Sequence, residues 1–193
     1  VFWSAAALYG NFDAPDYPLP AREDYPVNPT NDYAKTKLEA EEWLLHYHKH
    51  HGLWVTIMRC GAIYGEGATY AMGNAIILKL LGMLEPIIVG SGKNRVALIY
   101  ARDTVRIADV LARAEEASGR IFNARDNCAY TLEAIEEALG EAVGSPPFKK
   151  FRMPARAFKK MIVDPVQKQS KEWGIEPIID PGLAAMTTLD SYI

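Results

Sequence analysis

The hydrophobic positions of this chain fall into short runs rich in β-branched residues and longer stretches with helical spacing, separated by turns that contain glycine and proline. The short runs predict strands at residues 1–10, 54–65, 86–89, 96–100 and 121–124. The longer stretches predict helices at residues 31–51, 71–84, 105–116 and 131–140. Strands that alternate with helices in this way predict right-handed parallel crossovers. We therefore expect an α/β fold with its sites at the carboxyl ends of the strands.

The longest predicted helix, residues 31–51, carries the first candidate chemistry. Residues 30–32 can each cap its start, and Gly52 ends it. Tyr33 and Lys37 are four residues apart, so both side chains lie on one helix face. An ammonium close to a phenol favours the phenolate and lowers the tyrosine pKa, which suits proton transfer to or from a substrate hydroxyl. A coincidental Tyr and Lys at this spacing on an ordinary helix is the alternative.

All four histidines of the chain lie at the end of the same helix, within residues 46–51. His46 and His50 are four residues apart and can share a metal ion. No third ligand accompanies them at metal-binding spacing, and histidines near a helix C-terminus also suit the helix dipole as solvated cations. We therefore predict no metal site.

Composition narrows the class of protein. With 193 residues the chain is long enough for one well-buried domain, alone or with a small appendage. Its 49% hydrophobic and 23% charged residues are typical of a globular protein, and the net charge of -3 gives no general attraction to nucleic acid or anionic membranes. No apolar run reaches the roughly 20 residues that span a bilayer. Cys60 and Cys128 are too few for a disulfide framework, which favours a reducing, cytoplasmic location.

Four segments of the chain together resemble a known family. They are Ser-Ala-Ala-Ala-Leu-Tyr-Gly (residues 4–10), Glu-Asp-Tyr-Pro-Val-Asn-Pro (residues 23–29), Tyr33-x-x-x-Lys37 and Arg-Cys-Gly-Ala-Ile-Tyr-Gly (residues 59–65). In this order and spacing they resemble the extended short-chain dehydrogenase/reductase family, in the branch of NAD-dependent sugar-nucleotide epimerases and dehydratases. The tyrosine–lysine motif is weak by itself, and the resemblance depends on the combination of segments.

The resemblance implies the C-terminal part of a Rossmann-type parallel sheet with a small α/β substrate lobe. It places residues 1–66 and 97–125 in the sheet domain and residues 67–96 and 126–193 in the lobe. The N-terminal dinucleotide-binding strands are absent, since no G-x-G-x-x-G sequence precedes Tyr33. We therefore expect a C-terminal part of a longer protein, with a natural short form as the alternative.

The family's chemistry, carried over by resemblance, makes Tyr33 the catalytic acid/base. Lys37 would lower its pKa and hold the nicotinamide ribose. The family's third residue is a Ser or Thr on the preceding strand, and that position here is Ala5, with Ser4 one residue early. Ser4 is the remaining hydroxyl candidate, but one residue along a strand reverses the face, so Ser4 is predicted to point away from Tyr33 unless the strand is bulged.

The binding sites follow from the same resemblance. Backbone groups from Cys60 to Ile63 (Cys60, Gly61, Ala62 and Ile63) are expected to meet the nicotinamide of NAD or NADP, and Cys60 itself is expected to be a buried core thiol. Ala62 also occupies the substrate-binding position where epimerases have an Asn. Arg95 matches the arginine that meets the substrate's diphosphate, for which its planar fork is suited.

Two further segments have two interpretations each, and one further residue has a predicted structural role. The proline-rich residues 11–29 form a loop beside the active site or a rigid connector. The basic and aromatic residues 148–160 contact phosphates or form a solvated helix face. Asp103 is predicted to be the N-cap of the helix that follows it.

Together these features predict an NAD(P)-dependent oxidoreductase or epimerase/dehydratase that acts on a sugar nucleotide or another hydroxyl or carbonyl substrate. The alternative is a non-catalytic binding or regulatory relative with an incomplete active site. We expect a small-molecule substrate and a homodimer through the helix at residues 31–51, and neither nucleic acid nor a membrane as a partner.

Overall fold

The computed structural model describes residues 1–10, 16–69, 73, 76–77, 79, 81, 87–128, 130–142 and 151–175. Within this part the chain forms two compact units, residues 1–67 with 97–128, and residues 68–96 with 130–175. Most of the predicted helix at 71–84, the first part of the predicted loop at 11–29 and residues 148–150 of the basic segment lie outside the described residues.

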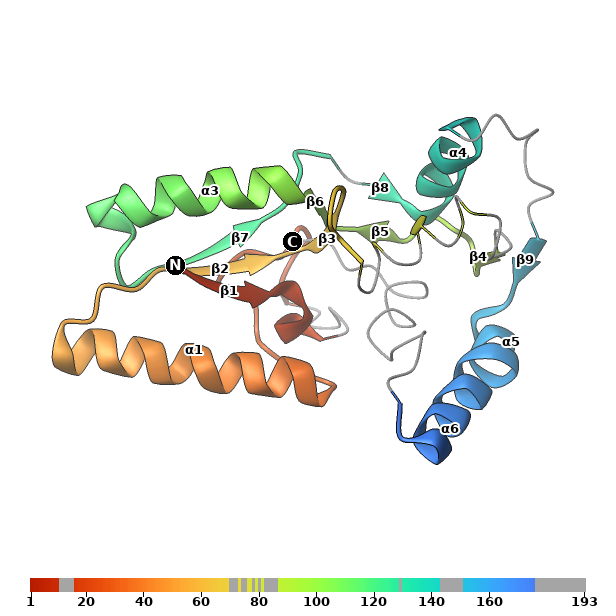
Figure 1. The fold of residues 1–193 in the computed structure, drawn as a ribbon, viewed down its shortest axis with the longest axis horizontal. Helices are drawn as coiled ribbons and strands as arrows, with labels where there is room; N and C mark the ends of the chain where they lie inside the picture. The colour runs from red at the N-terminus through yellow and green to blue at the C-terminus, as the bar shows by residue number, and fades with distance from the viewer. Residues whose placement is uncertain are drawn as a thin grey trace. The chain divides into compact units, whose positions relative to one another are not determined.

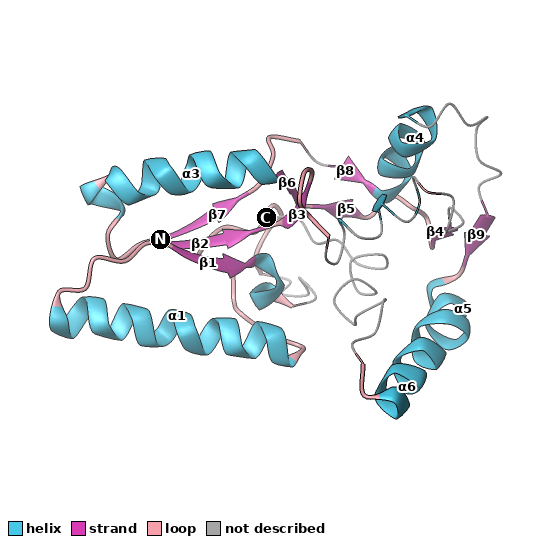
Figure 2. Ribbon diagram, viewed as in Figure 1, coloured by secondary structure: helices cyan, strands magenta, loops and turns pink. Residues whose placement is uncertain are grey.

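The first unit is a parallel sheet covered by a helix on each face (Figures 1 and 2). Three of its strands form one sheet in the order β1–β2–β7, and β3 pairs in parallel with β6. Its elements are β1 (Phe2–Ala5), a 3-10 turn (Ala6–Tyr9), α1 (Asp32–His51), β2 (Ile57–Cys60), β3 (Ala62–Tyr64), β6 (Leu98–Tyr100), α3 (Ala101–Arg113), a second 3-10 turn (Glu115–Ala117) and β7 (Ile121–Ala124). The predicted α/β fold class with a parallel sheet is therefore confirmed.

The register of the sheet assigns side chains to its two faces. Ser4 pairs with Arg59, and Arg59 pairs with Asn123, so these three side chains point to one face. Arg59 bonds Glu41 of α1, which identifies this as the face that α1 covers. The next row, with Ala5 on β1, points to the opposite face. There Met58, Cys60 and Ala124 of the strands pack with Ala108 and Leu111 of α3.

Local sequence explains where α1 begins and ends. The Asn31 side chain accepts a hydrogen bond from Ala34 N at 2.8 Å, as an N-cap should. Gly52 ends the helix in a left-handed conformation (φ 69°) that other residues rarely adopt. The predicted helix over residues 31–51 is thus confirmed, with Asn31 as its cap.

Gly61 separates β2 from β3, where one longer strand was predicted. A Cβ at this position would lie 2.6 Å from Ala97 O, so only glycine allows the two backbones to approach this closely. The chain leaves β2 here and pairs with β6 instead of β7.

The prediction that Asp103 is an N-cap is wrong. Helix α3 begins at Ala101, directly after β6, with Tyr100 as the N-cap residue. Asp103 therefore lies in the first turn, where its carboxylate pairs with Arg106 at 2.8 Å.

None of the helices in the described part of the chain is long and apolar enough to cross a membrane.

The second unit contains two small sheets and a helical arm. Strands β4 and β9 pair in parallel, β5 and β8 pair antiparallel, and Val89, Phe158 and Val163 form a core cluster. Thr131 caps α4 by accepting a hydrogen bond from Ala134 N at 3.2 Å. The elements are β4 (Ile87–Val89), β5 (Arg95–Val96), β8 (Tyr130–Thr131), α4 (Leu132–Ala142), β9 (Phe151–Met153), α5 (Ala155–Phe158), a π-helical turn (Lys159–Val163) and α6 (Asp164–Trp173).

Candidate active site

Tyr33 and Lys37 lie near the start of α1, which runs antiparallel to the strands and so begins at their carboxyl ends (Figure 1). Lys37 Nζ donates a hydrogen bond to Trp3 O at 2.8 Å and lies 5.7 Å from the centre of the Tyr33 ring. The Tyr33 side chain is 55% exposed. The structure therefore brings the predicted acid/base pair together beside β1, with the phenol exposed.

Cys60 is a buried thiol within the electrostatic reach of the same lysine. Burial raises the pKa of Cys60 to about 11, although the Lys37 ammonium opposes this shift. A thiol with so high a pKa is almost entirely protonated at neutral pH and is a poor nucleophile. Its surroundings are those of a core residue.

The side chains of Ser4 and Ala5 point to the opposite faces of the sheet from those predicted from the sequence. The register places Ser4 on the face that α1 covers, rather than on the face away from that helix. The Ser4 side chain is only 4% exposed, and its hydroxyl has no hydrogen-bond partner among the described residues. Ala5 points to the opposite face and carries no hydroxyl.

The backbone from Cys60 to Ile63 is largely used by the fold itself. Gly61 N donates to Ala124 O at 2.9 Å, and Ala62 N donates to Ala97 O at 2.8 Å. These two N–H groups are therefore not free to bind a nicotinamide amide. The Ile63 side chain is exposed at this edge.

Arg95 belongs to the second unit. It lies on β5 opposite Thr131 of β8 and is partly buried. Its role in binding a diphosphate stays a prediction.

A buried polar network between α1 and the sheet was not predicted from the sequence. Arg59 Nη2 donates to Glu41 Oε2 at 2.7 Å, and Arg59 Nη1 donates to the Tyr9 hydroxyl at 3.0 Å. The Tyr9 hydroxyl donates in turn to Asn123 Oδ1 at 2.7 Å. The network joins α1, β2, β7 and the turn after β1.

The electrostatics of this network agree with its hydrogen bonds. Burial raises the pKa of Tyr9, so its phenol stays protonated and can donate to Asn123, although the hydrogen bond from Arg59 opposes the shift. Burial alone would lower the pKa of Arg59, but its hydrogen bonds to Glu41 and Tyr9 raise it above the ordinary value. Two sequence signals were available but were not used: Arg59 is a charged residue within an apolar strand, and Glu41 follows Lys37 at the four-residue helical spacing.

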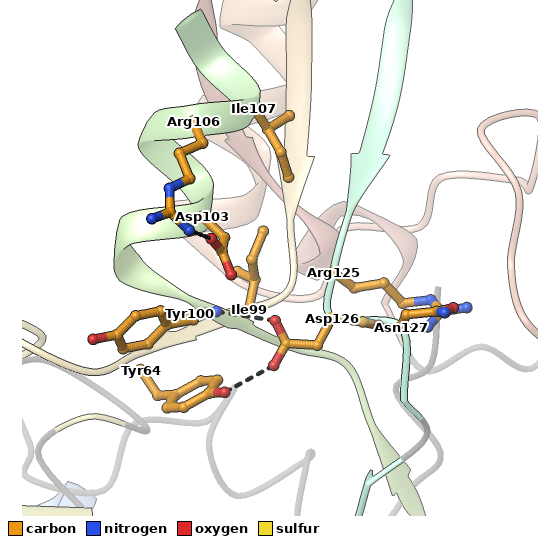
Figure 3. Close-up of a pocket in the computed structure, with 9 residues that line it drawn as sticks. All are labelled: Tyr64, Ile99, Tyr100, Asp103, Arg106, Ile107, Arg125, Asp126 and Asn127. Atoms are coloured by element: carbon orange, nitrogen blue, oxygen red, sulfur yellow. Dashed lines mark hydrogen bonds and ion pairs between the residues drawn. The ribbon is translucent and has the colours of Figure 1, made fainter. Parts of the chain in front are cut away.

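A separate cavity of about 540 Å³ opens in the first unit near the ends of β3, β6 and β7 (Figure 3). Asp126 lines it and accepts hydrogen bonds from the Tyr64 hydroxyl at 2.9 Å and from Tyr100 N at 3.1 Å. Asp103 and Arg106 pair with each other on its wall. These polar groups bind one another, and none of the predicted catalytic residues lines the cavity.

Comparison with known proteins identifies the family. Residues 1–124 match the model of the NAD dependent epimerase/dehydratase family, which is well over half of the chain. The protein therefore belongs to this family, and the resemblance to extended short-chain dehydrogenases/reductases is confirmed.

Individual relatives show how much of a family member is present. A UDP-glucose 4-epimerase from Corynebacterium glutamicum is 26% identical over 199 residues, covering 92% of this chain and 57% of that protein. The dTDP-glucose 4,6-dehydratase from Bacillus anthracis in complex with NAD superposes with a TM-score of 0.61 at 20% identity, covering 96% of this chain and 59% of that one. RMD from Pseudomonas aeruginosa complexed with NADPH gives a TM-score of 0.61 at 18% identity, covering 79% and 53%. The chain thus spans little more than half of the length of these proteins.

Proposed function

We propose that this protein is an NAD(P)-dependent oxidoreductase or epimerase/dehydratase that acts on a sugar nucleotide, with Tyr33 as its catalytic acid/base. The observation that carries the proposal is the position of Tyr33 and Lys37, which lie side by side next to β1 with the tyrosine exposed. Membership of the epimerase/dehydratase family, and relatives named for UDP-glucose and dTDP-glucose, support the substrate class.

The proposed chemistry needs a proton carrier with a stabilised conjugate base. The Tyr33 phenolic oxygen takes a proton from a sugar hydroxyl that is being oxidised, or returns one to a carbonyl that is being reduced. The Lys37 ammonium favours the phenolate electrostatically. Its hydrogen bond to Trp3 O ties the lysine to β1 and limits the directions in which Nζ can point.

Tyr33 and Lys37 fit the ribose beside the nicotinamide of a dinucleotide, whereas the Gly61 and Ala62 amides predicted to meet the nicotinamide itself are bonded within the fold. Tyr33 and Lys37 offer a hydroxyl and an ammonium that can hold ribose hydroxyls, while the chain contains no G-x-G-x-x-G loop for the pyrophosphate. When bound, the nicotinamide supplies the hydride acceptor or donor. We propose the second unit as the substrate-binding lobe, with Arg95 as its contact to the diphosphate.

The test is a Tyr33→Phe substitution in the complete protein, assayed against a panel of UDP- and dTDP-hexoses. Removing the hydroxyl removes the proton carrier, so we expect turnover to fall by at least about 100-fold while the dissociation constant for NADH changes little. Tyr47→Phe, another exposed tyrosine of α1, is the matched control and should keep full activity. Full activity in the Tyr33→Phe protein would overturn the assignment.

A non-catalytic binding or regulatory role is the second candidate, and one observation favours it. Ala5 has no hydroxyl and Ser4 is buried, so β1 presents no exposed hydroxyl beside Tyr33. NADH fluorescence with the complete protein separates the two candidates. Enhanced emission that saturates with protein supports the enzyme, and its absence supports a non-catalytic relative.

A further inference from the structure

The end of α1 opposite the tyrosine–lysine pair carries a second arrangement of side chains. His46 and His50 are one helical turn apart, and both are exposed. Their ring centres are 4.4 Å apart with an angle of 40° between the ring planes. The two imidazoles are therefore neighbours on one surface of the helix.

This separation suits two imidazoles on one metal ion. A nitrogen–metal bond of about 2 Å puts each ring centre about 3 Å from the metal. Two such rings at adjacent coordination positions, about 90° apart, have centres about 4.5 Å apart. The spacing of the two ring centres thus matches that of a two-imidazole chelate, and the helix backbone holds the two residues one turn apart.

The surroundings distinguish this pair from His48, and the ring centre of His51 is farther from that of His46, at 6.4 Å. His48 faces inward, because its Nδ1 contacts Leu53 O at 2.8 Å and its Nε2 lies against Gly119. The carbonyl end of α1 favours a nearby positive charge. No group of three or more His, Cys, Asp or Glu with metal-binding geometry occurs among the described residues, which leaves the remaining coordination positions to water.

We propose that His46 and His50 form a two-histidine chelating site for a divalent transition-metal ion on the surface of α1. The sequence lacked a third ligand and led us to predict no metal site, but neither the ring separation nor the inward position of His48 is visible in the sequence. Imidazole ligands predict the affinity order Cu²⁺ above Ni²⁺ and Zn²⁺, with no comparable binding of Mg²⁺ or Ca²⁺. The site is independent of the proposed enzymatic function.

The test titrates the complete protein, purified without a polyhistidine tag, with Cu²⁺, Ni²⁺ and Zn²⁺ by calorimetry. Because each histidine supplies half of the chelate, His46→Ala and His50→Ala should each raise the dissociation constant at least 10-fold. His51→Ala, at the same helix end, is the control and should change it less than 2-fold. Since the chelating geometry exists only in the folded helix, Zn²⁺ at 100 times its dissociation constant should raise Tm by several degrees in the unmodified protein and not in His50→Ala.

Trp43 provides a local optical signal. Its ring centre lies 6.2 Å from that of His46, so bound Cu²⁺ should quench part of the tryptophan emission. Trp43→Phe should lose that quenching and keep the calorimetric affinity. Equal losses of metal affinity in the His46, His50 and His51 variants would show that the ion binds diffusely to the histidine-rich end of α1, and would overturn the proposal. So would unchanged affinity in His46→Ala, or Mg²⁺ binding as tight as Ni²⁺ binding.

Discussion

Ser4 and Ala5 occupy the end of β1 and point to opposite faces of the sheet. The residue with a hydroxyl is the one buried under α1, and that hydroxyl has no hydrogen-bond partner among the described residues. A buried hydroxyl without a partner costs roughly 1–3 kcal/mol of desolvation that nothing offsets. Ser4 thus carries a cost in the fold that a small apolar residue would not.

We expect Ser4→Ala to raise the free energy of unfolding by roughly 1–3 kcal/mol, because the unpaired polar group is removed with little change of volume. Urea unfolding measures this change as a shift of the transition midpoint, provided that the slope of the free energy against urea concentration stays the same. Assaying the same variant tests its predicted catalytic role: a fall in turnover without a fall in stability would assign Ser4 to the chemistry. Destabilisation beyond about 1 kcal/mol would instead contradict the unpaired state of the hydroxyl.

At the scale of elements, helix α1 is fixed to the sheet by a buried ion pair. Glu41 and Arg59 are almost completely buried and joined by hydrogen bonds of 2.7–3.2 Å. Glu41 follows Lys37 by one helical turn, so the contact that fixes α1 also fixes the orientation of the face that carries Tyr33 and Lys37. The arrangement of the candidate site therefore depends on this pair.

Arg59→Met should lower the free energy of unfolding by about 3–5 kcal/mol, because it leaves the Glu41 carboxylate buried without its partner. The double variant Arg59→Met with Glu41→Leu removes both charges and should recover most of that loss. Denaturant unfolding of the single and double variants measures the coupling. Equal stability of the two variants would mean that the ion pair does not hold α1 in place.

At the scale of the whole molecule, α1 has apolar side chains on both faces. Ala34 is buried against the sheet, while Trp43 on the opposite side is 58% exposed and contacts Tyr47. An exposed aromatic pair on a long helix suits contact with a second copy of the chain. The homodimer through α1 is a proposal that rests on this surface and on the family resemblance, and because His46 lies beside Trp43 and Tyr47 it would share this surface with the proposed metal site.

We expect Trp43→Ser to raise the dissociation constant of such a dimer at least 10-fold, about 1.4 kcal/mol, since a central aromatic contact is lost. Sedimentation of the complete protein over a range of concentrations measures it. Trp173→Ser is the control, because Trp173 is 65% exposed but lies on α6 of the second unit. A monomeric unmodified protein, or equal effects of both substitutions, would exclude this interface.

The sequence by itself determined the features that depend on neighbouring residues. Asn31 and Gly52 set the limits of α1, and the four-residue spacing alone placed Tyr33 beside Lys37, because helix geometry is local. The order of strands and helices was sufficient for the α/β fold class and, with the family segments, for the family.

Only the tertiary structure decided the features that depend on segments far apart in the chain. It placed Ser4 in a row with Arg59, and it paired Arg59 with Glu41. It also committed the amides of Gly61 and Ala62 to β-sheet bonds. Strand register and burial arise from pairing between segments far apart in the chain, and no local pattern encodes that pairing. A shift of one residue would turn every side chain of a strand to the other face of the sheet.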